Sequence, residues 1–143
     1  MTRRKSPKRG ATLIEFALVA FLLMMVIFAG FEFNRMILVY TTLASASRAG
    51  VRYAIVHGSD RTGSSGSDPA SGPLDTSYVV AKVKQFASMG TLNTDNLTVT
   101  VDYPVNNKPG SLVKVSLSYP YNPFVVLPLN VNITSATQGR IVF

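Results

Sequence analysis

Residues Ala11–Phe31 read ATLIEFALVAFLLMMVIFAGF and contain one ionisable residue, Glu15. At 1.5 Å per residue, a helix over this segment is about 32 Å long, enough to cross a hydrocarbon core of roughly 30 Å. The apolar region of a cleaved secretory signal is shorter, about 7–15 residues, and ends at a small-residue cleavage site. The residues after this segment, Glu32 to Arg35, do not resemble such a site. The segment is therefore predicted to stay in the protein as a single transmembrane helix.

Basic residues are concentrated before the apolar segment. The chain has 143 residues and a formal net charge of +7, and five of its fourteen Lys and Arg residues lie in the first nine positions. These five are Arg3, Arg4, Lys5, Lys8 and Arg9. The positive-inside bias places this end in the cytoplasm and the following domain outside the inner membrane. The remaining residues carry nine basic and seven acidic groups, which argues against a nucleic-acid-binding face.

Glu15 is the informative residue of the segment. It lies about 6 Å along the helix from Ala11, near one end of the apolar run. A carboxylate in hydrocarbon is unfavourable, and two interpretations remain open. In the first, the side chain reaches the headgroup region. In the second, the acid is buried in the membrane and pairs with a cation from another chain, because this helix offers none nearby.

The junction KRGATLIEF, residues 8–16, resembles a class III signal peptide of type IV pilins and pseudopilins. In those proteins a membrane aspartyl peptidase, the prepilin peptidase, cuts after a glycine that ends a short basic leader. An acid lies at the fifth mature position and an aromatic residue at the sixth. The resemblance implies cleavage between Gly10 and Ala11, with Glu15 and Phe16 at those two positions. The apolar helix then survives cleavage as an anchor and assembly element.

Two further stretches, GFEFNR at 30–35 and ASRAGVRYA at 46–54, resemble the two signatures of the TadE-like family. Members are small pseudopilins of the tight-adherence (Flp) pilus assembly system. The resemblance covers roughly residues 9–56 and departs from the family at Asn34, where glycine is frequent. The helix signature residues are Glu32, Phe33, Arg35, Arg48, Gly50 and Arg52.

The resemblance implies a minor or accessory component of a pilus used in cell adhesion. Its implied partners are the inner membrane, the prepilin peptidase and other pilins or pseudopilins, and no nucleic acid. The Glu15 carboxylate is expected to pair with the new N-terminal amine of Ala11 on a neighbouring subunit. The alternative is a signal-anchored periplasmic binding or adhesion module that is neither processed nor assembled.

The rest of the chain predicts an α+β, pilin-like domain. Divided by composition, the chain has a basic leader (1–10), a transmembrane and extended helix (11–56), a Gly/Ser-rich loop (57–77) and an extracytoplasmic domain (78–143). A single helical face of the extended helix, spaced by steps of four and three, is expected to pack on the domain's own sheet or, alternatively, in a coiled coil with a partner. Its members are Phe33, Ile37, Tyr40, Ala44, Ser47, Val51 and Ala54.

Within 78–143, a short helix is predicted over Tyr78–Met89, capped by Ser77 or Asp75, with three apolar residues facing inward. These three are Val79, Val83 and Phe86. Period-two alternation over 97–103 and 113–119, separated by turn residues at 106–110, predicts an antiparallel hairpin. A third strand is expected around 129–133, and 140–143 is an optional fourth.

The segment Pro120–Pro128 (PYNPFVVLP) is predicted not to be a central strand because of its three prolines. It is expected to cross the sheet edge and bury Phe124 and Leu127, or alternatively to form an exposed docking patch. The chain has no cysteine and one histidine, His57, which a loop position predicts to be solvated. No catalytic set, metal site or cofactor site is predicted, and the chain is not expected to be an enzyme.

Overall fold

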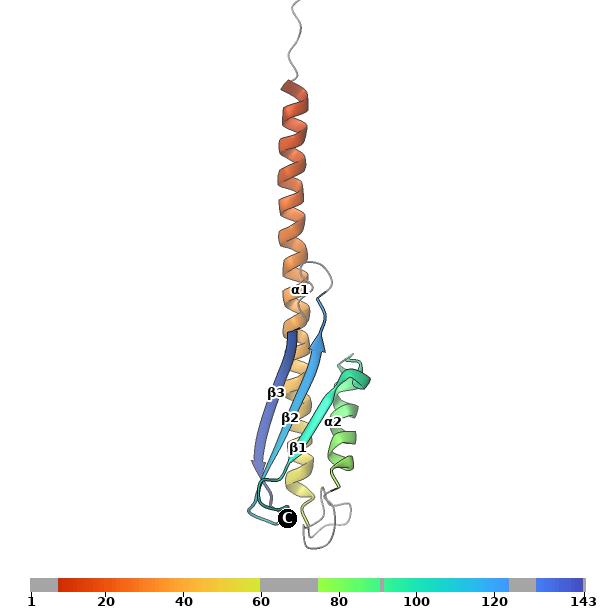
Figure 1. Cartoon of the computed structure of the whole chain (residues 1–143), viewed down its shortest axis with the longest axis vertical. Helices are drawn as coiled ribbons and strands as arrows, with labels where there is room; N and C mark the ends of the chain where they lie inside the picture. The colour runs from red at the N-terminus through yellow and green to blue at the C-terminus, as the bar shows by residue number, and fades with distance from the viewer. Residues whose placement is uncertain (1–7, 60–74, 91, 124–130, 143) are drawn as a thin grey trace, which may run out of the picture.

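The computed structural model describes residues 8–59, 75–90, 92–123 and 131–142. One long helix projects from a small domain formed by the lower half of that helix, a second helix and a sheet (Figure 1). The predicted α+β class, with a long N-terminal helix, a short helix and a small antiparallel sheet, is therefore confirmed. The elements are α1 (Lys8–Val56), α2 (Ser77–Met89), the 3-10 helix η1 (Thr94–Asn96), β1 (Thr98–Asp102), β2 (Leu112–Tyr121) and β3 (Val131–Arg140).

The sheet has the order β1-β2-β3, and both neighbouring pairs are antiparallel. Val115, in the middle of β2, pairs with Val101 on one side and Thr137 on the other. The alternation predicted for the first two strands is confirmed, since Val113, Val115 and Leu117 are buried while Leu112 and Lys114 are exposed. One face of the sheet is therefore apolar and requires a cover.

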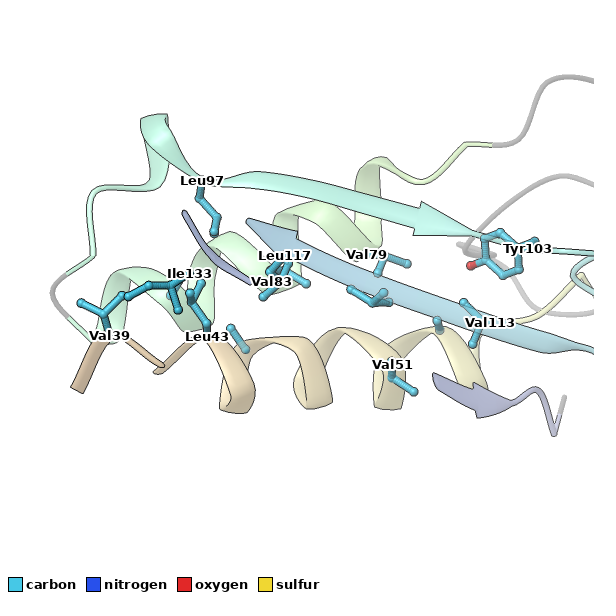
Figure 2. Packing of buried hydrophobic residues seen from close by; sticks show 14 of the residues in the cluster. Val39, Leu43, Val51, Val79, Val83, Leu97, Tyr103, Val113, Leu117 and Ile133 are labelled. Carbon is cyan, nitrogen blue, oxygen red and sulfur yellow. The ribbon is translucent and has the colours of Figure 1, made fainter. Parts of the chain in front are cut away.

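The cover is the lower half of α1, with α2 beside it. Figure 2 shows Leu43 from α1, Val83 from α2 and Leu117 from β2 close together in the core, and Val51 of α1 belongs to the same cluster of buried residues. The close approach of α1 to β3 depends on small residues. A Cβ atom at Gly139 of β3 would lie 2.5 Å from the Ile55 side chain, so only glycine fits there without a shift.

The turn between β1 and β2 is also tied to the end of α1. Gly110 has a φ of +89°, a conformation that side chains disfavour, and its N–H donates to the carbonyl of Ile141 at 2.8 Å. The carbonyl of Asn107 accepts a hydrogen bond from the N–H of Ser59, just after α1. The predicted turn at 106–110 thus closes the hairpin and also holds the lower end of the helix.

The buried face of α1 is broader than predicted and begins closer to the C-terminal end of the helix. Phe33, Ile37 and Tyr40 are exposed, and the first buried apolar residue of α1 is Val39. The other predicted positions fit better, with Ala44 half-buried and the remainder buried. Two different elements cover this half of α1, the sheet and α2, so its buried face exceeds one stripe. Its fully or nearly buried members are Val39, Leu43, Ala46, Ser47, Gly50, Val51 and Ala54.

Helix α2 also differs in detail from its prediction. Val79 and Val83 are buried as expected, but Ala87 takes the third inward position and Phe86 is 48% exposed. Both choices fit a helical period, and the smaller side chain, Ala87, is the one that is fully buried in the core. At the start of α2 the N-cap is Thr76, which makes no side-chain capping bond. The Asp75 side chain instead accepts the N–H of Ser77 at 2.9 Å, so of the two predicted caps the acid supplies the bond.

Two expectations for the last part of the sequence are corrected. Pro120 lies inside β2, which is the central strand, and pairs with Asn132 of β3. It is tolerated because β1 begins at Thr98, opposite Ser118, and does not reach Pro120, which therefore has a neighbouring strand on one side only. Arg140 ends β3 and no strand follows it within the described residues. Residues 1–7, the loop residues 60–74 and the Phe124–Leu127 stretch lie outside the described part of the chain.

Candidate functional site

The projecting half of α1 is apolar on every side. Its large side chains are exposed in the described structure, from Leu13 at 69% to Leu38 at 54%. Within the described residues one helix is long and apolar enough to cross a membrane, and it is this one. An exposed apolar surface of this length requires lipid or other helices around it. The chain is therefore anchored in a membrane by α1.

The predicted processing and pairing residues lie at the tip of this half. Gly10 and Ala11 are in the first turns of α1, both exposed, and nothing lies within 4 Å of a Cβ built at Gly10. Glu15 and Phe16 follow one turn later and are also exposed. Glu15 makes no hydrogen bond or ion pair with the described residues. The described residues of a single chain therefore supply no cation that pairs with the Glu15 carboxylate.

Where α1 enters the domain, two signature residues meet a residue that the sequence did not single out. Tyr121, the last residue of β2, is 3% exposed and donates its hydroxyl hydrogen to the Glu32 carboxylate. The hydroxyl also lies 3.3 Å from the Glu32 backbone carbonyl. Arg35 completes the cluster, with its Nη1 3.7 Å from Glu32 Oε1 and its guanidinium 5.3 Å from the centre of the Tyr121 ring. We call these three residues the junction cluster.

The electrostatics of the junction cluster follow from its burial. Removal of the Tyr121 hydroxyl from water, the hydrogen bond to Glu32 and the charge of that carboxylate together raise the pKa of Tyr121 to about 12, and the removal from water contributes most. Arg35 acts in the opposite direction. The Tyr121 hydroxyl therefore remains protonated and able to donate its hydrogen at physiological pH. The cluster fixes the domain against α1 directly below the exposed half.

Gly50 is the signature residue at the centre of the domain. A Cβ atom there would lie 2.5 Å from Val83 Cγ2 and 3.5 Å from Val115 Cγ1. One turn earlier, the buried Ser47 hydroxyl lies 2.8 Å from Thr137 Oγ1 and donates to the Ala44 carbonyl at 3.0 Å. The small residues of this signature thus let α1, α2 and the sheet approach one another closely.

The other three signature residues point away from the core. Phe33 is 60% exposed beside the junction cluster, and Arg48 and Arg52 are exposed beside α2. The two arginines line a groove of about 430 Å³ with Ser45, Ala49 and Phe86. The structure therefore separates the signature into three parts: the junction, the packing contact at Gly50 and an outward-facing group.

Two residues of these sites were missed by pattern alone. Tyr121 continues the period-two alternation of Leu117 and Tyr119, but Pro120 interrupts that pattern in the sequence. Phe86 was predicted to face the core, but it lines the groove instead.

His57 also differs from its prediction, because its ring stacks on Tyr53 at 4.0 Å between centroids and its Nδ1 lies 2.9 Å from the Tyr53 carbonyl. Among the described residues no group of three or more His, Cys, Asp or Glu side chains is arranged to hold a metal ion.

The comparisons agree with the helix signatures. The family model for TadE-like proteins matches residues 10–52. This match covers 43 of the 143 residues, and over this segment the chain is similar to TadE-like proteins. Searches of curated proteins and of solved structures found no match. The matched segment extends along α1 from Gly10 to Arg52 and contains Gly50 and two members of the junction cluster, Glu32 and Arg35.

Proposed function

We propose that this chain is a minor pseudopilin or accessory subunit in the assembly of a tight-adherence pilus. The observation that carries the proposal is the family match, which begins at Gly10, the residue after which the prepilin peptidase is expected to cut. The basic leader favours a cytoplasmic N-terminus, so the C-terminal domain lies in the periplasm and α1 spans the bacterial inner membrane. The role is one of assembly and not of catalysis.

Processing at Gly10 is compatible with its place in the helix. The bond between Gly10 and Ala11 lies in the first turns of α1, so a peptidase must locally unwind this end to reach the backbone. Glycine lowers helix stability by about 1 kcal/mol relative to alanine, and helix termini fray. Removal of the leader then leaves α1 almost complete, with an ammonium group at Ala11.

Glu15 supplies the assembly contact in this proposal. Side chains on a helix lean toward its N-terminus, so the carboxylate is directed toward the level of Ala11. A parallel neighbouring helix at the usual separation of about 8–10 Å brings its own Ala11 amine within reach of that carboxylate. Pairing in hydrocarbon offsets the unfavourable burial of both charges, whereas either group alone remains unfavourable.

In this proposal the junction cluster connects the membrane helix mechanically to the domain. Glu32 and Arg35 of α1 hold Tyr121 at the end of β2, so a force applied to the membrane helix is transmitted to the sheet. Gly50 and Ser47 extend the same attachment through the lower half of the domain. The domain and α1 are therefore expected to move into an assembly as one body.

The test is pilus production in a strain that lacks the chromosomal copy and carries a variant. With Glu15→Ala, pili are expected to be lost or strongly reduced, while the variant is made and stays in the membrane. Glu15→Asp retains a carboxylate and is expected to restore part of the function. Leu18→Ala, in the same apolar segment, is the control for a general effect on the helix. Normal pili with Glu15→Ala would favour a signal-anchored periplasmic binding or adhesion module instead.

A further inference from the structure

A groove runs along the seam between α1 and α2, on the outside of the domain. One part is lined by Ser45, Arg48, Ala49 and Arg52 of α1 with Phe86 of α2. A second hollow shares Ser45 and Phe86 and continues along the seam toward the membrane half of α1. Its other lining residues are Thr41, Thr42, Met89 and Gly90. We call the two together the α1/α2 groove.

The groove is positively charged. Arg48 and Arg52 are four residues apart, so both lie on the same side of α1, and neither forms an ion pair with a described residue. Lys82 precedes Phe86 by one turn and shares its side of α2. No acidic residue occurs in α2, and the nearest acid along α1, Glu32, is about 24 Å from Arg48. The surface therefore offers cations without matching carboxylates nearby on either helix.

The walls of the groove suit a helix. Thr41, Ser45 and Ala49 are small and recur every fourth residue, which lets the backbone of another helix approach α1 closely. On the opposite wall, Phe86 is 48% exposed and Met89 is 76% exposed. Two apolar side chains three residues apart form a hydrophobic contact surface along the seam.

Lipid headgroups are not suitable occupants. Arg48 lies 17 residues beyond Phe31, the last residue of the apolar segment, which is about 26 Å along α1. The headgroup layer adds only about 5–8 Å to each side of the hydrocarbon core. Helix tilt does not close this gap, because at a tilt of 40° the height is still about 20 Å.

A second copy is also a poor match. The acids of α1 are Glu15 and Glu32, which are 17 residues apart, and α2 has none. Neither α1 nor α2 can therefore present two carboxylates at the four-residue spacing of Arg48 and Arg52.

We propose that the α1/α2 groove binds a helix of a different protein on the same side of the membrane. This helix carries two acidic side chains three or four residues apart beside an apolar residue. The carboxylates pair with Arg48 and Arg52, with Lys82 adding to the field, and the apolar residue contacts Phe86. The inference rests on the membrane anchoring in the proposed function and does not depend on cleavage after Gly10.

The test is site-specific photo-crosslinking of the full-length chain in native membranes, with p-benzoyl-phenylalanine in place of Phe86. An adduct with another protein is expected, and its crosslinked peptide contains the acidic pair. The double variant Arg48→Glu, Arg52→Glu is expected to reduce the adduct by about tenfold or more. The double variant Lys84→Glu, Arg140→Glu makes the same change in net charge away from the groove and should leave the adduct unchanged.

A charge exchange completes the experiment. Replacement of the partner's two acids by lysine should abolish the adduct with the wild-type groove and restore it with Arg48→Glu, Arg52→Glu. An adduct that is insensitive to the arginines, an adduct with lipid or with a second copy, or no adduct would overturn the proposal. The intact mass of the chain in the same membranes reports leader cleavage separately, so failure of this inference is distinguishable from failure of the pseudopilin proposal.

Discussion

The two halves of α1 are one continuous helix in two different surroundings. From Gly10 to Leu38 large apolar side chains are exposed on all sides, whereas from Val39 onward one side is buried against the sheet and α2. The difference is one of residue size as well as burial. The upper half is rich in Phe, Leu and Met, and the lower half uses Ala, Ser and Gly on its inner side. Large residues all round require a surrounding of lipid or helices, and small residues allow close packing on the chain's own sheet.

The largest effect expected from this comparison is at two leucines on the same helix. Leu43 is fully buried, so Leu43→Ala should lower the free energy of unfolding of the domain by about 2–5 kcal/mol through a lost contact and a cavity. Leu22 is 61% exposed, and Leu22→Ala should change it by less than about 0.5 kcal/mol. Urea unfolding of the full-length protein in detergent micelles, followed by near-UV circular dichroism, measures both. Equal effects would show that the halves do not differ in this way.

A pair of glycines sharpens the comparison. Gly50→Ala places a Cβ 2.5 Å from Val83 Cγ2, so overpacking of about 1–3 kcal/mol should outweigh a gain of about 1 kcal/mol in helix propensity. Gly30→Ala meets nothing within 4 Å and should leave the domain's stability unchanged or slightly raised. The same unfolding measurement applies. A stabilised Gly50→Ala variant would contradict the close packing of α1 on α2.

The junction cluster lies between the two halves and should have an intermediate effect. Tyr121→Phe removes the donor to the Glu32 carboxylate and is expected to lower the free energy of unfolding by about 1–2 kcal/mol. Tyr78→Phe, at a half-exposed tyrosine, is the matched control and should have almost no effect. If both variants behave alike, the hydrogen bond to Glu32 does not stabilise the attachment of the sheet to α1.

The pH dependence of this contribution follows from the raised pKa of Tyr121. The folded protein holds the hydroxyl proton more tightly than the unfolded chain, where the pKa is near 10. The stabilisation is therefore complete below pH 10 and is lost as the pH rises toward about 12. The difference in unfolding free energy between wild type and Tyr121→Phe should shrink over that range. A difference that stays constant from pH 8 to pH 12 would contradict the buried, carboxylate-bonded hydroxyl.

Local patterns predicted most of this fold because each is repeated over many residues. The apolar run from Ala11 and the alternation of Val113, Val115 and Leu117 indicate a helix and a strand on their own. The inner face of α2 could not be decided in this way. Val79 and Val83 continue equally well to Phe86 or to Ala87, and the choice depends on the surface of α1, which is a tertiary property.

The candidate sites show the same limit. The junction cluster joins Glu32 to Tyr121, 89 residues apart. Pro120 interrupts the alternating pattern of β2, so the sequence does not indicate that this strand extends to Tyr121. Proline is tolerated there because β1 does not extend past Ser118 to pair with Pro120, and this register is not visible in the sequence. The residues at the tip of α1 are a different case. Cleavage after Gly10 and pairing of Glu15 remain predictions, because each involves a second protein.

The most direct test of the central claim is the intact mass of the protein from its native host and from the same host without the prepilin peptidase. We expect a peptidase-dependent loss of Met1–Gly10, about 1.2 kDa, with Ala11 as the new N-terminus. That result would make the exposed half of α1 a mature assembly element that begins with an amine one turn before Glu15. A full-length chain in both hosts would contradict the account and leave α1 as an ordinary membrane anchor.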